Sequence, residues 1–171
     1  MASIVELDES NGSSETVTHA VGSLAMGTVD APNMVPGASG ARQGAGTNSI
    51  SKMLRFHLTA LGGGLGITNL RVYCDPSATG WTLHGNAHTN QGTYNGARLT
   101  SYVAPDTDTA KVPTALPVSD PGTANLGIGG TLAASLSAPG WSDYLRLQLR
   151  AASGVVASFS SPAFFAYDDV G

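Results

Sequence analysis

Charged side chains are scarce in this chain. Asp, Glu, Lys and Arg make up 12% of its 171 residues, against roughly 25% in ordinary soluble domains. The formal net charge is -4, so the sequence carries no basic footprint and predicts no nucleic-acid partner. A weakly charged surface repels close neighbours only slightly. The composition therefore favours a protein that is packed into an assembly.

Cysteine and long apolar runs are also missing. Cys74 is the single cysteine, so no intrachain disulfide can form, and the pattern predicts a small buried residue on a strand. No apolar stretch approaches the ~18 residues of a membrane span, which predicts no membrane partner. Residues 1–10 lack a basic segment followed by an apolar one, so we expect no signal peptide and synthesis in a cytoplasm.

Motifs for catalysis and cofactors are absent as well. The sequence has no GxSxG elbow, and its glycine runs at 62–66 and 127–130 lack the Lys of a phosphate-binding loop. We therefore predict a protein that is not an enzyme, with no catalytic residues and no cofactor.

Histidine spacing offers one pair of candidate metal ligands, His84 and His88. They lie four residues apart, the spacing that places two imidazoles on one helix face. The residues between them are Gly, Asn and Ala in a loop-like stretch, and no third ligand is evident. The sequence therefore predicts no metal site. His57, on the polar side of a strand, is interpreted as a surface or interface histidine.

Alternating apolar residues indicate strands throughout the chain. Leu54, Phe56 and Leu58 alternate with polar residues, and the pattern resumes at Leu70 and Val72 after a glycine-rich connection, which indicates a hairpin or a sheet corner. Leu145, Leu147 and Leu149 repeat it in a third strand, and we expect these leucines to pack across the sandwich from the first two apolar sets. Further strands are expected at 81–84, 97–104, 127–134 (or a short helix at 131–137) and 164–167.

These patterns predict an all-β fold with a single antiparallel β-sandwich of Ig-like or jelly-roll type and long Pro/Gly-rich loops. The sandwich is placed at 48–171, and residues 1–47 are interpreted as an extended N-terminal arm with edge strands and a polar turn at 8–14. An arm gains affinity by adding a strand to a partner. The predicted interface comprises apolar residues of the arm and two loop aromatics: Ile4, Val5, Val17, Val21, Met34, Trp81 and Tyr94.

Three stretches together resemble a known family: NSISKMLRFHLTALGGGLGITNLRVYCD, WSDYLRLQLRAASG and FFAYDD. They are similar to small β-sandwich structural proteins of tailed-bacteriophage heads and tails. The resemblance covers roughly residues 48–75 and 140–169 and brings no site residues with it.

The resemblance implies a virion location and a capsid cement, or decoration, protein that oligomerises and stabilises the phage head. Its partners would be the major capsid protein or other virion proteins, together with further copies of itself as a dimer or trimer. A tail or baseplate subunit is the alternative. From another class, a carbohydrate- or receptor-binding module could use Trp81 and Trp141, because exposed aromatic rings stack on sugars.

Overall fold

The computed structural model describes residues 2–32, 43–75, 80–88, 94–155 and 162–171. Nearly all of its regular structure is β, which confirms the predicted fold class. The elements in chain order are β1 (Ile4–Asn11), β2 (Thr16–Thr18), β3 (Lys52–Ala60), β4 (Gly66–Cys74), β5 (Trp81–Gly85), the 3-10 turn η2 (Thr109–Lys111), β6 (Thr114–Ala115), β7 (Gly140–Trp141), β8 (Leu145–Ala151) and β9 (Ala163–Val170). Among these described residues, no helix is long and apolar enough to cross a membrane.

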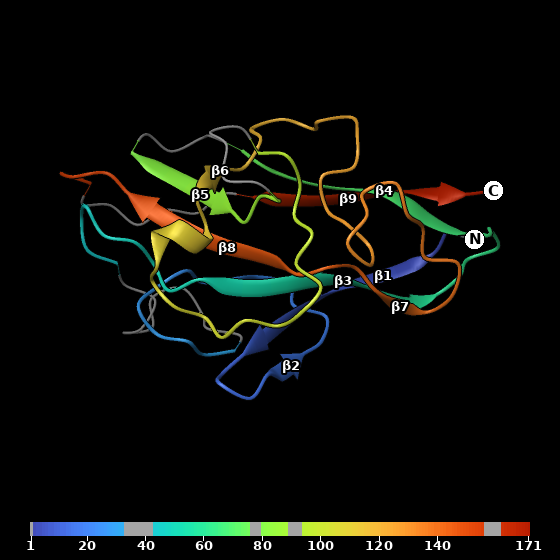
Figure 1. The fold of residues 1–171 in the computed structure, drawn as a ribbon, viewed down its shortest axis with the longest axis horizontal. Coiled ribbons are helices and arrows are strands. Elements are labelled where there is room, and N and C mark those ends of the chain that lie inside the picture. Colours follow the sequence, from blue (N-terminus) through green and yellow to red (C-terminus); the bar gives the residue numbers. More distant parts are fainter. Residues whose placement is uncertain (1, 33–42, 76–79, 89–93, 156–161) are drawn as a thin grey trace.

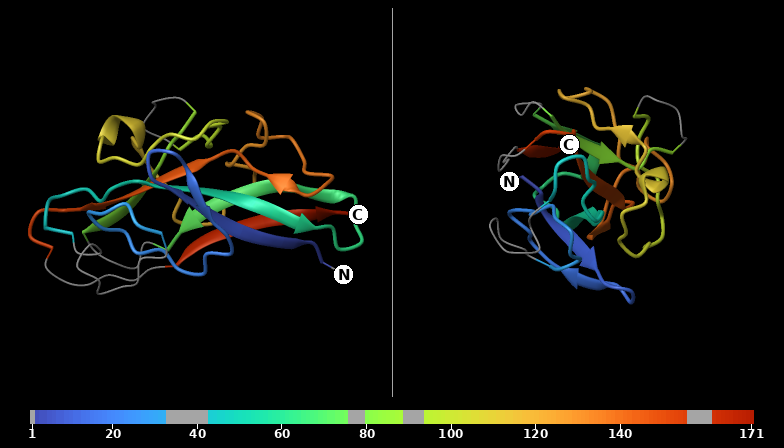
Figure 2. Two further views of the ribbon diagram at one scale, coloured as in Figure 1. Left: turned by 90° about the horizontal axis from the view of Figure 1, so that it is seen from below. Right: turned by 90° about the vertical axis from the view of Figure 1, so that its left-hand side faces the viewer.

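Two antiparallel sheets face each other. The larger has seven strands, with the order β2-β1-β3-β8-β5-β6 and with β7 added to β3. The smaller contains β4 and β9. Figures 1 and 2 show an elongated molecule in which β1, β3 and β9 run along the length, and both termini lie at the same end.

The core lies between the sheets and is built from the strands that alternate most regularly. Leu54, Phe56 and Leu58 of β3 are at most 3% exposed, and they meet Leu70 and Val72 of β4 across the sandwich. Leu145, Leu147 and Leu149 of β8 are buried beside them. Cys74 is also buried, and burial raises the pKa of its thiol. The predicted apolar residues are therefore buried, but the expected placement of the β8 leucines across the sandwich from β3 was wrong, because β8 pairs with β3 in the same sheet.

The glycine-rich connection after β3 does not form a hairpin, because it carries the chain from one sheet to the other. Gly66 has a φ of 153° and lies against the backbone of residue 136, whose carbonyl oxygen would be 2.3 Å from an added Cβ. Only glycine tolerates both the dihedral angle and the close approach. These glycines therefore have a backbone role, as their composition indicated.

The N-terminal segment differs from the expected arm. β1 is paired with β3 from Ile4 to Ser10, and its other edge pairs with β2. Residues 8–11, expected as a polar turn, are the buried half of this strand. Val21 and Ala25 of the following segment are also buried. β1 and β2 are thus part of the larger sheet, and Lys52 of β3 pairs with the Glu9 carboxylate that β1 buries.

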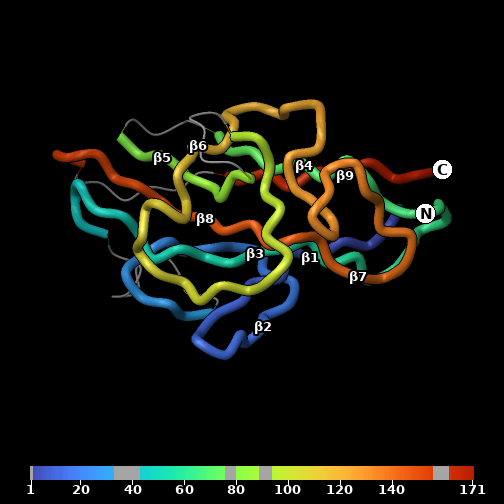
Figure 3. Tube along the Cα trace, in the orientation of Figure 1, coloured from blue at the N-terminus to red at the C-terminus, as the bar shows by residue number. Residues whose placement is uncertain are grey.

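Long irregular segments connect β5 to β8 (Figure 3). Part of this stretch packs into the core and against β4: Ala97 and Leu126 are buried in the core, and Leu136 bridges Ile67. Two of these segments were expected to contain strands, at 97–104 and 127–134, but the structure has only isolated bridges there. Leu99 bridges Tyr144, and Ala97 bridges Leu126. Their alternation of residue types reflects one-sided packing, and no neighbouring strand is available to extend the ladder.

Candidate functional site

Asp8 and Glu9 are consecutive residues of β1 that point to opposite faces of the larger sheet. Successive side chains of a strand alternate between faces, and Asp8 lies opposite Arg55 whereas Glu9 lies opposite Leu54. Glu9 therefore points into the sandwich and Asp8 points out of it. Both are buried, with residue exposures of 1% and 0%.

The Asp8 carboxylate is buried under three ring side chains, here called the Asp8 cluster: His19, His57 and Trp141. The Trp141 indole Nε1 donates a hydrogen bond of 2.9 Å to Asp8 Oδ2. The Nδ1 atoms of His19 and His57 lie 3.0 and 3.2 Å from the same oxygen. The other oxygen, Oδ1, is buried and has no hydrogen-bond partner in the described structure. All the contacts of the carboxylate thus fall on one atom.

Strand pairing fixes two members of the cluster. β7 pairs with β3 so that Trp141 lies opposite His57, and their rings stack at 4.5 Å with an interplanar angle of 17°. His19 follows β2, and its side chain is 56% exposed. Its ring centroid lies 5.6 Å from that of His57. The site is therefore built from a rigid floor and one side chain at the solvent boundary.

Arg55 borders the cluster but directs its charge elsewhere. Its guanidinium lies 5.0 Å from the Trp141 ring centroid and 4.6 Å from that of Tyr144. The same group is 3.8 Å from Glu15, which accepts hydrogen bonds from the hydroxyls of Tyr144 and Ser10. Burial and this carboxylate raise the pKa of Tyr144 to about 12. No salt bridge joins Arg55 to Asp8, although they are opposite each other in the ladder.

Glu9, on the other face, has a full complement of partners. Lys52 Nζ lies 2.6 Å from Glu9 Oε1, and both side chains are 1% exposed. Asn11 donates to the same oxygen, and Lys52 also donates to the carbonyl of Ala31. This is a closed ion pair inside the sandwich and has no opening for a ligand.

The Asp8 cluster was not predicted from the sequence. Asp8 lies on β1, His19 in the segment after β2, and His57 on β3. No short spacing in the sequence therefore connects them. The usable signals were a histidine on the polar side of a strong strand and an acidic residue that continues the strand periodicity of residues 4–7. Within the described residues, this is the one group of His, Cys, Asp or Glu side chains that could hold a metal ion.

The predicted candidate ligands lie elsewhere and do not belong to that group. His84 is half-buried on β5, where burial, and next the charge of Arg150, lower its pKa. His88 is exposed in the segment after β5. β5 is a strand, so the spacing of four residues does not create a shared helix face.

The predicted interface residues are scattered. Ile4 is 53% exposed at the start of β1, whereas Val21 is 8% exposed and belongs to the core. Val5 and Tyr94 are partly buried against the core, and Val17 and Trp81 are also partly buried. Met34 lies outside the described residues. These positions do not form one surface, and their role as an interface stays a prediction.

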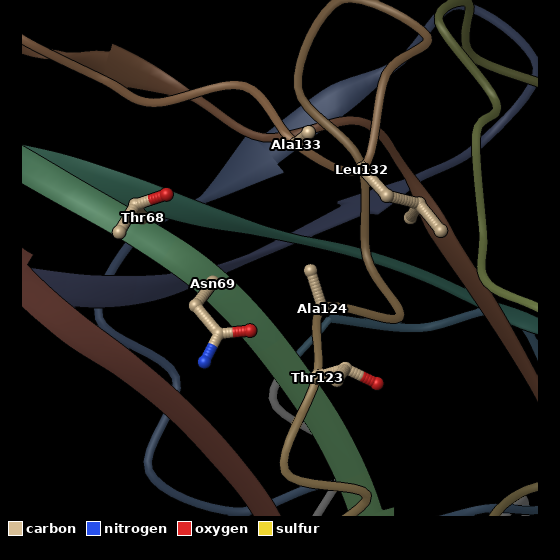
Figure 4. Close-up of a pocket in the computed structure, with 6 residues that line it drawn as sticks. All are labelled: Thr68, Asn69, Thr123, Ala124, Leu132 and Ala133. Carbon is tan, nitrogen blue, oxygen red and sulfur yellow. The ribbon is translucent and has the colours of Figure 1, made fainter.

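Two hollows mark the surface, and neither has a set of convergent reactive groups. One, of about 330 Å³, lies between Thr68 and Asn69 of β4 and the loop residues Thr123, Ala124, Leu132 and Ala133, none of which is charged (Figure 4). The other, of about 380 Å³, is bordered by Arg98, Lys111 and Arg146. Lys111 and Arg146 both pair with Asp106, so much of the local positive charge is already balanced.

Comparisons with protein-family models, with curated proteins and with solved structures find no match to this chain.

Proposed function

We propose that this chain is a structural protein of a bacteriophage particle, a capsid decoration protein that acts by assembling with copies of itself on the head lattice. The virion assignment rests on the resemblance of the two strand regions and the closing aromatic strand. The low charge of the chain supports close packing among neighbours. The observation that carries assembly is the edge of β9.

β9 is paired along one edge only in the part of the chain that the structure describes. Its partner β4 uses its own second edge for other contacts: the Cys74 N–H donates to the carbonyl of Pro117, and the Val72 N–H donates to Asn125. Ala163 and Phe165 lie opposite these two residues. Because backbone groups alternate between the edges of a strand, the N–H and C=O groups of Ala163 and Phe165 point away from β4.

This outward edge lacks the usual protection against pairing. Monomeric proteins guard edge strands with Lys, Pro, bulges or inward-pointing charges. The first half of β9, residues 163–167, contains no Lys, Pro or charged residue, and its pairing with β4 is regular from Ala163 to Ala166. Phe164 is 40% exposed and stacks on Tyr73 at 4.9 Å. The edge is therefore suited to accept another strand.

The occupant we propose is β9 of a second copy. Two identical antiparallel edges related by a two-fold axis are self-complementary, because each outward donor meets an acceptor of the same strand in the partner. The two acidic residues, Asp168 and Asp169, follow the apolar half of the strand. In an antiparallel pair centred on Ala166, where each outward-facing residue meets another outward-facing residue, Asp168 and Asp169 lie opposite Phe164 and Ala163 of the partner, so like charges do not face each other.

Sedimentation of the full chain tests the assembly. The wild-type protein should sediment as a dimer, and Phe164→Lys should shift it toward the monomer because a charge then sits on the edge. Ala163→Pro should act in the same way, since it removes an outward N–H and leaves the bonds to β4 intact. Val118→Lys is the matched control, because Val118 is 59% exposed and lies outside β9. A monomeric wild-type protein, or equal loss in the control, would refute assembly through β9.

The virion assignment needs a separate measurement. The protein should be found in purified particles in many copies, and particles that lack it should lose infectivity at a lower temperature. A few copies per particle would instead favour the tail or baseplate alternative. Absence from particles would remove the virion assignment while leaving the result on β9 unaffected.

A further inference from the structure

We propose that Asp8, His19 and His57 form a binding site for one divalent transition-metal ion, with Zn²⁺ as the best match. The site is independent of β9 and of the virion assignment. It lies on the outer face of the larger sheet, where the three side chains converge.

The distances between the donor atoms suit a single ion. Tetrahedral Zn²⁺ binds imidazole nitrogen and carboxylate oxygen at roughly 2.0–2.2 Å, which puts neighbouring donors about 3.3 Å apart. Asp8 Oδ2 lies 3.0 Å from His19 Nδ1 and 3.2 Å from His57 Nδ1. One ligand atom from each of the three residues lies within 4.8 Å of the others. Little movement is needed to place an ion among them.

Two polar atoms at the site have no other use in the described structure. Asp8 Oδ1 is buried and accepts no hydrogen bond, although the carboxylate is fully shielded from solvent. His57 Nδ1 is buried too, and its contact with Asp8 lacks hydrogen-bond geometry. A buried polar group without a partner costs about 1–3 kcal/mol, and more when it is charged. A bound cation would take His57 Nδ1 as a ligand and would offset the charge of the carboxylate that carries Oδ1.

The charges around Asp8 also favour a bound cation. No Lys or Arg forms a salt bridge with Asp8 among the described residues. Arg55 is the nearest candidate by register, but it lies against Trp141 and Tyr144 and faces Glu15. An ionised carboxylate buried in this way needs a positive charge beside it, and a divalent ion bound by two neutral imidazoles supplies one.

The donor set selects the class of ion. Mg²⁺ and Ca²⁺ prefer sites made wholly of oxygen, whereas imidazole suits Zn²⁺, Cu²⁺, Ni²⁺ and Co²⁺. The Trp141 N–H bonded to Asp8 Oδ2 provides the outer support that metal sites need to orient a ligand. Stacking on the same indole fixes the plane of the His57 ring.

Three protein ligands leave one tetrahedral position for water or for a donor from a partner. The exposed ring of His19 places the site at the protein surface, where solvent can reach it. The ion would also link three segments: β1, the chain after β2, and β3. Binding should therefore stabilise the folded chain, because an ion that binds only the native state raises its stability.

The test uses the full chain with any purification tag removed and with metal stripped by a chelator. Calorimetric titration with Zn²⁺ should give one site per chain, and Co²⁺ should give the visible absorption of a tetrahedral complex. Zn²⁺ should raise the midpoint of thermal unfolding, whereas Mg²⁺ should leave it unchanged.

His19→Ala is the decisive variant, because this exposed side chain can be removed without disturbing the sheet. It should weaken Zn²⁺ binding by at least about 10-fold, the scale seen even when only an outer partner is lost. His88→Ala removes an exposed histidine far along the chain and should change nothing. The proposal fails if wild-type protein gives no Co²⁺ band and no Zn²⁺ stabilisation, which would leave ion pairs between Asp8 and histidine only. It also fails if His19→Ala binds as wild type, or if the His88→Ala control loses binding equally.

Discussion

The two faces of β1 treat neighbouring carboxylates differently. Glu9 is closed into an ion pair with Lys52, whereas among the described residues Asp8 is met by two imidazoles and an indole N–H and by no Lys or Arg. Both groups are buried, so both must offset the cost of leaving water. For Glu9, the ammonium group of Lys52 and the amide of Asn11 offset this cost. The Asp8 side leaves an oxygen without a partner, and this difference is what distinguishes a structural ion pair from a site that can take a ligand.

The largest effect should come from opening the Glu9 ion pair. Lys52→Met keeps the length of the side chain but removes the ammonium group that lies against the buried Glu9 carboxylate. Breaking a buried pair on one side costs about 3–5 kcal/mol. Urea unfolding should therefore show a loss of that size.

Lys111→Met is the matched control for this variant. Lys111 also pairs with an aspartate, but its side chain is 47% exposed, and exposed pairs contribute about 0–1 kcal/mol. The double variant Glu9→Leu with Lys52→Met should recover much of the lost stability. Equal costs for Lys52→Met and Lys111→Met would show that the Glu9 pair is no more important than a surface pair.

A smaller effect should separate Asp8 from Arg55. Both side chains lie on one face, opposite each other in the ladder, and a sequence argument would join them as an ion pair. The structure directs Arg55 to two aromatic rings and Glu15 instead. In metal-free protein, Arg55→Gln should cost about 1 kcal/mol from lost cation–π contacts.

A double-mutant cycle with Asp8→Asn measures this separation. The costs of Arg55→Gln and Asp8→Asn should add to within about 0.5 kcal/mol, as for independent sites. The same cycle on Glu9→Gln and Lys52→Met should give a coupling free energy of more than about 2 kcal/mol. A strong coupling between Asp8 and Arg55 would mean that Asp8 has a permanent cation after all, and the contrast between the two faces would disappear.

The sequence predicted the core because leucine alternation determines which face of a strand is buried. β3 and β4 follow that rule, and their apolar residues meet as expected. In β8 the leucines are buried too, but Arg146 and Gln148 on its other face are also buried, at 2% and 0%. The rule fails for residues 8–11, a polar run that is buried all the same. Their partners lie far away in the chain: Lys52 is 43 residues from Glu9, and Trp141 is 133 residues from Asp8. Hydrophobic periodicity contains no information about such pairs.

The candidate site was missed for the same reason. The sequence favoured His84 and His88 because a motif search looks for short spacings, which apply to ligands on one helix. In this fold the ligands are gathered by strand register: β1 against β3, and the chain returning after β2. Register depends on the whole sheet, so the convergence of His19 and His57 on Asp8 could not be read from their positions in the chain.

The smallest effect concerns Asp106, a third carboxylate that extends the comparison to the solvent boundary. Burial alone would raise the pKa of Asp106, but hydrogen bonds from Lys111 and from the Asp108 N–H, together with the charge of Arg146, lower it below its usual value. A carboxyl group whose pKa is lower in the folded state adds stability above its unfolded pKa of about 3.9 and loses it as the pH falls through the folded value.

Asp106→Asn should therefore be less stable than wild type near neutral pH, and the difference should shrink as the pH falls below about 4. Urea unfolding of both proteins across that range measures it. The Asp106 side chain is 34% exposed, so solvent screening keeps the difference well below that for Lys52→Met. In the Asp106→Asn background, Lys111→Met should add no further pH dependence in this range. A difference in stability that stayed constant with pH would mean that the ion pairs of Asp106 contribute nothing. Pairing with a cation would then stabilise this protein only where the carboxylate is buried, as it is at Glu9.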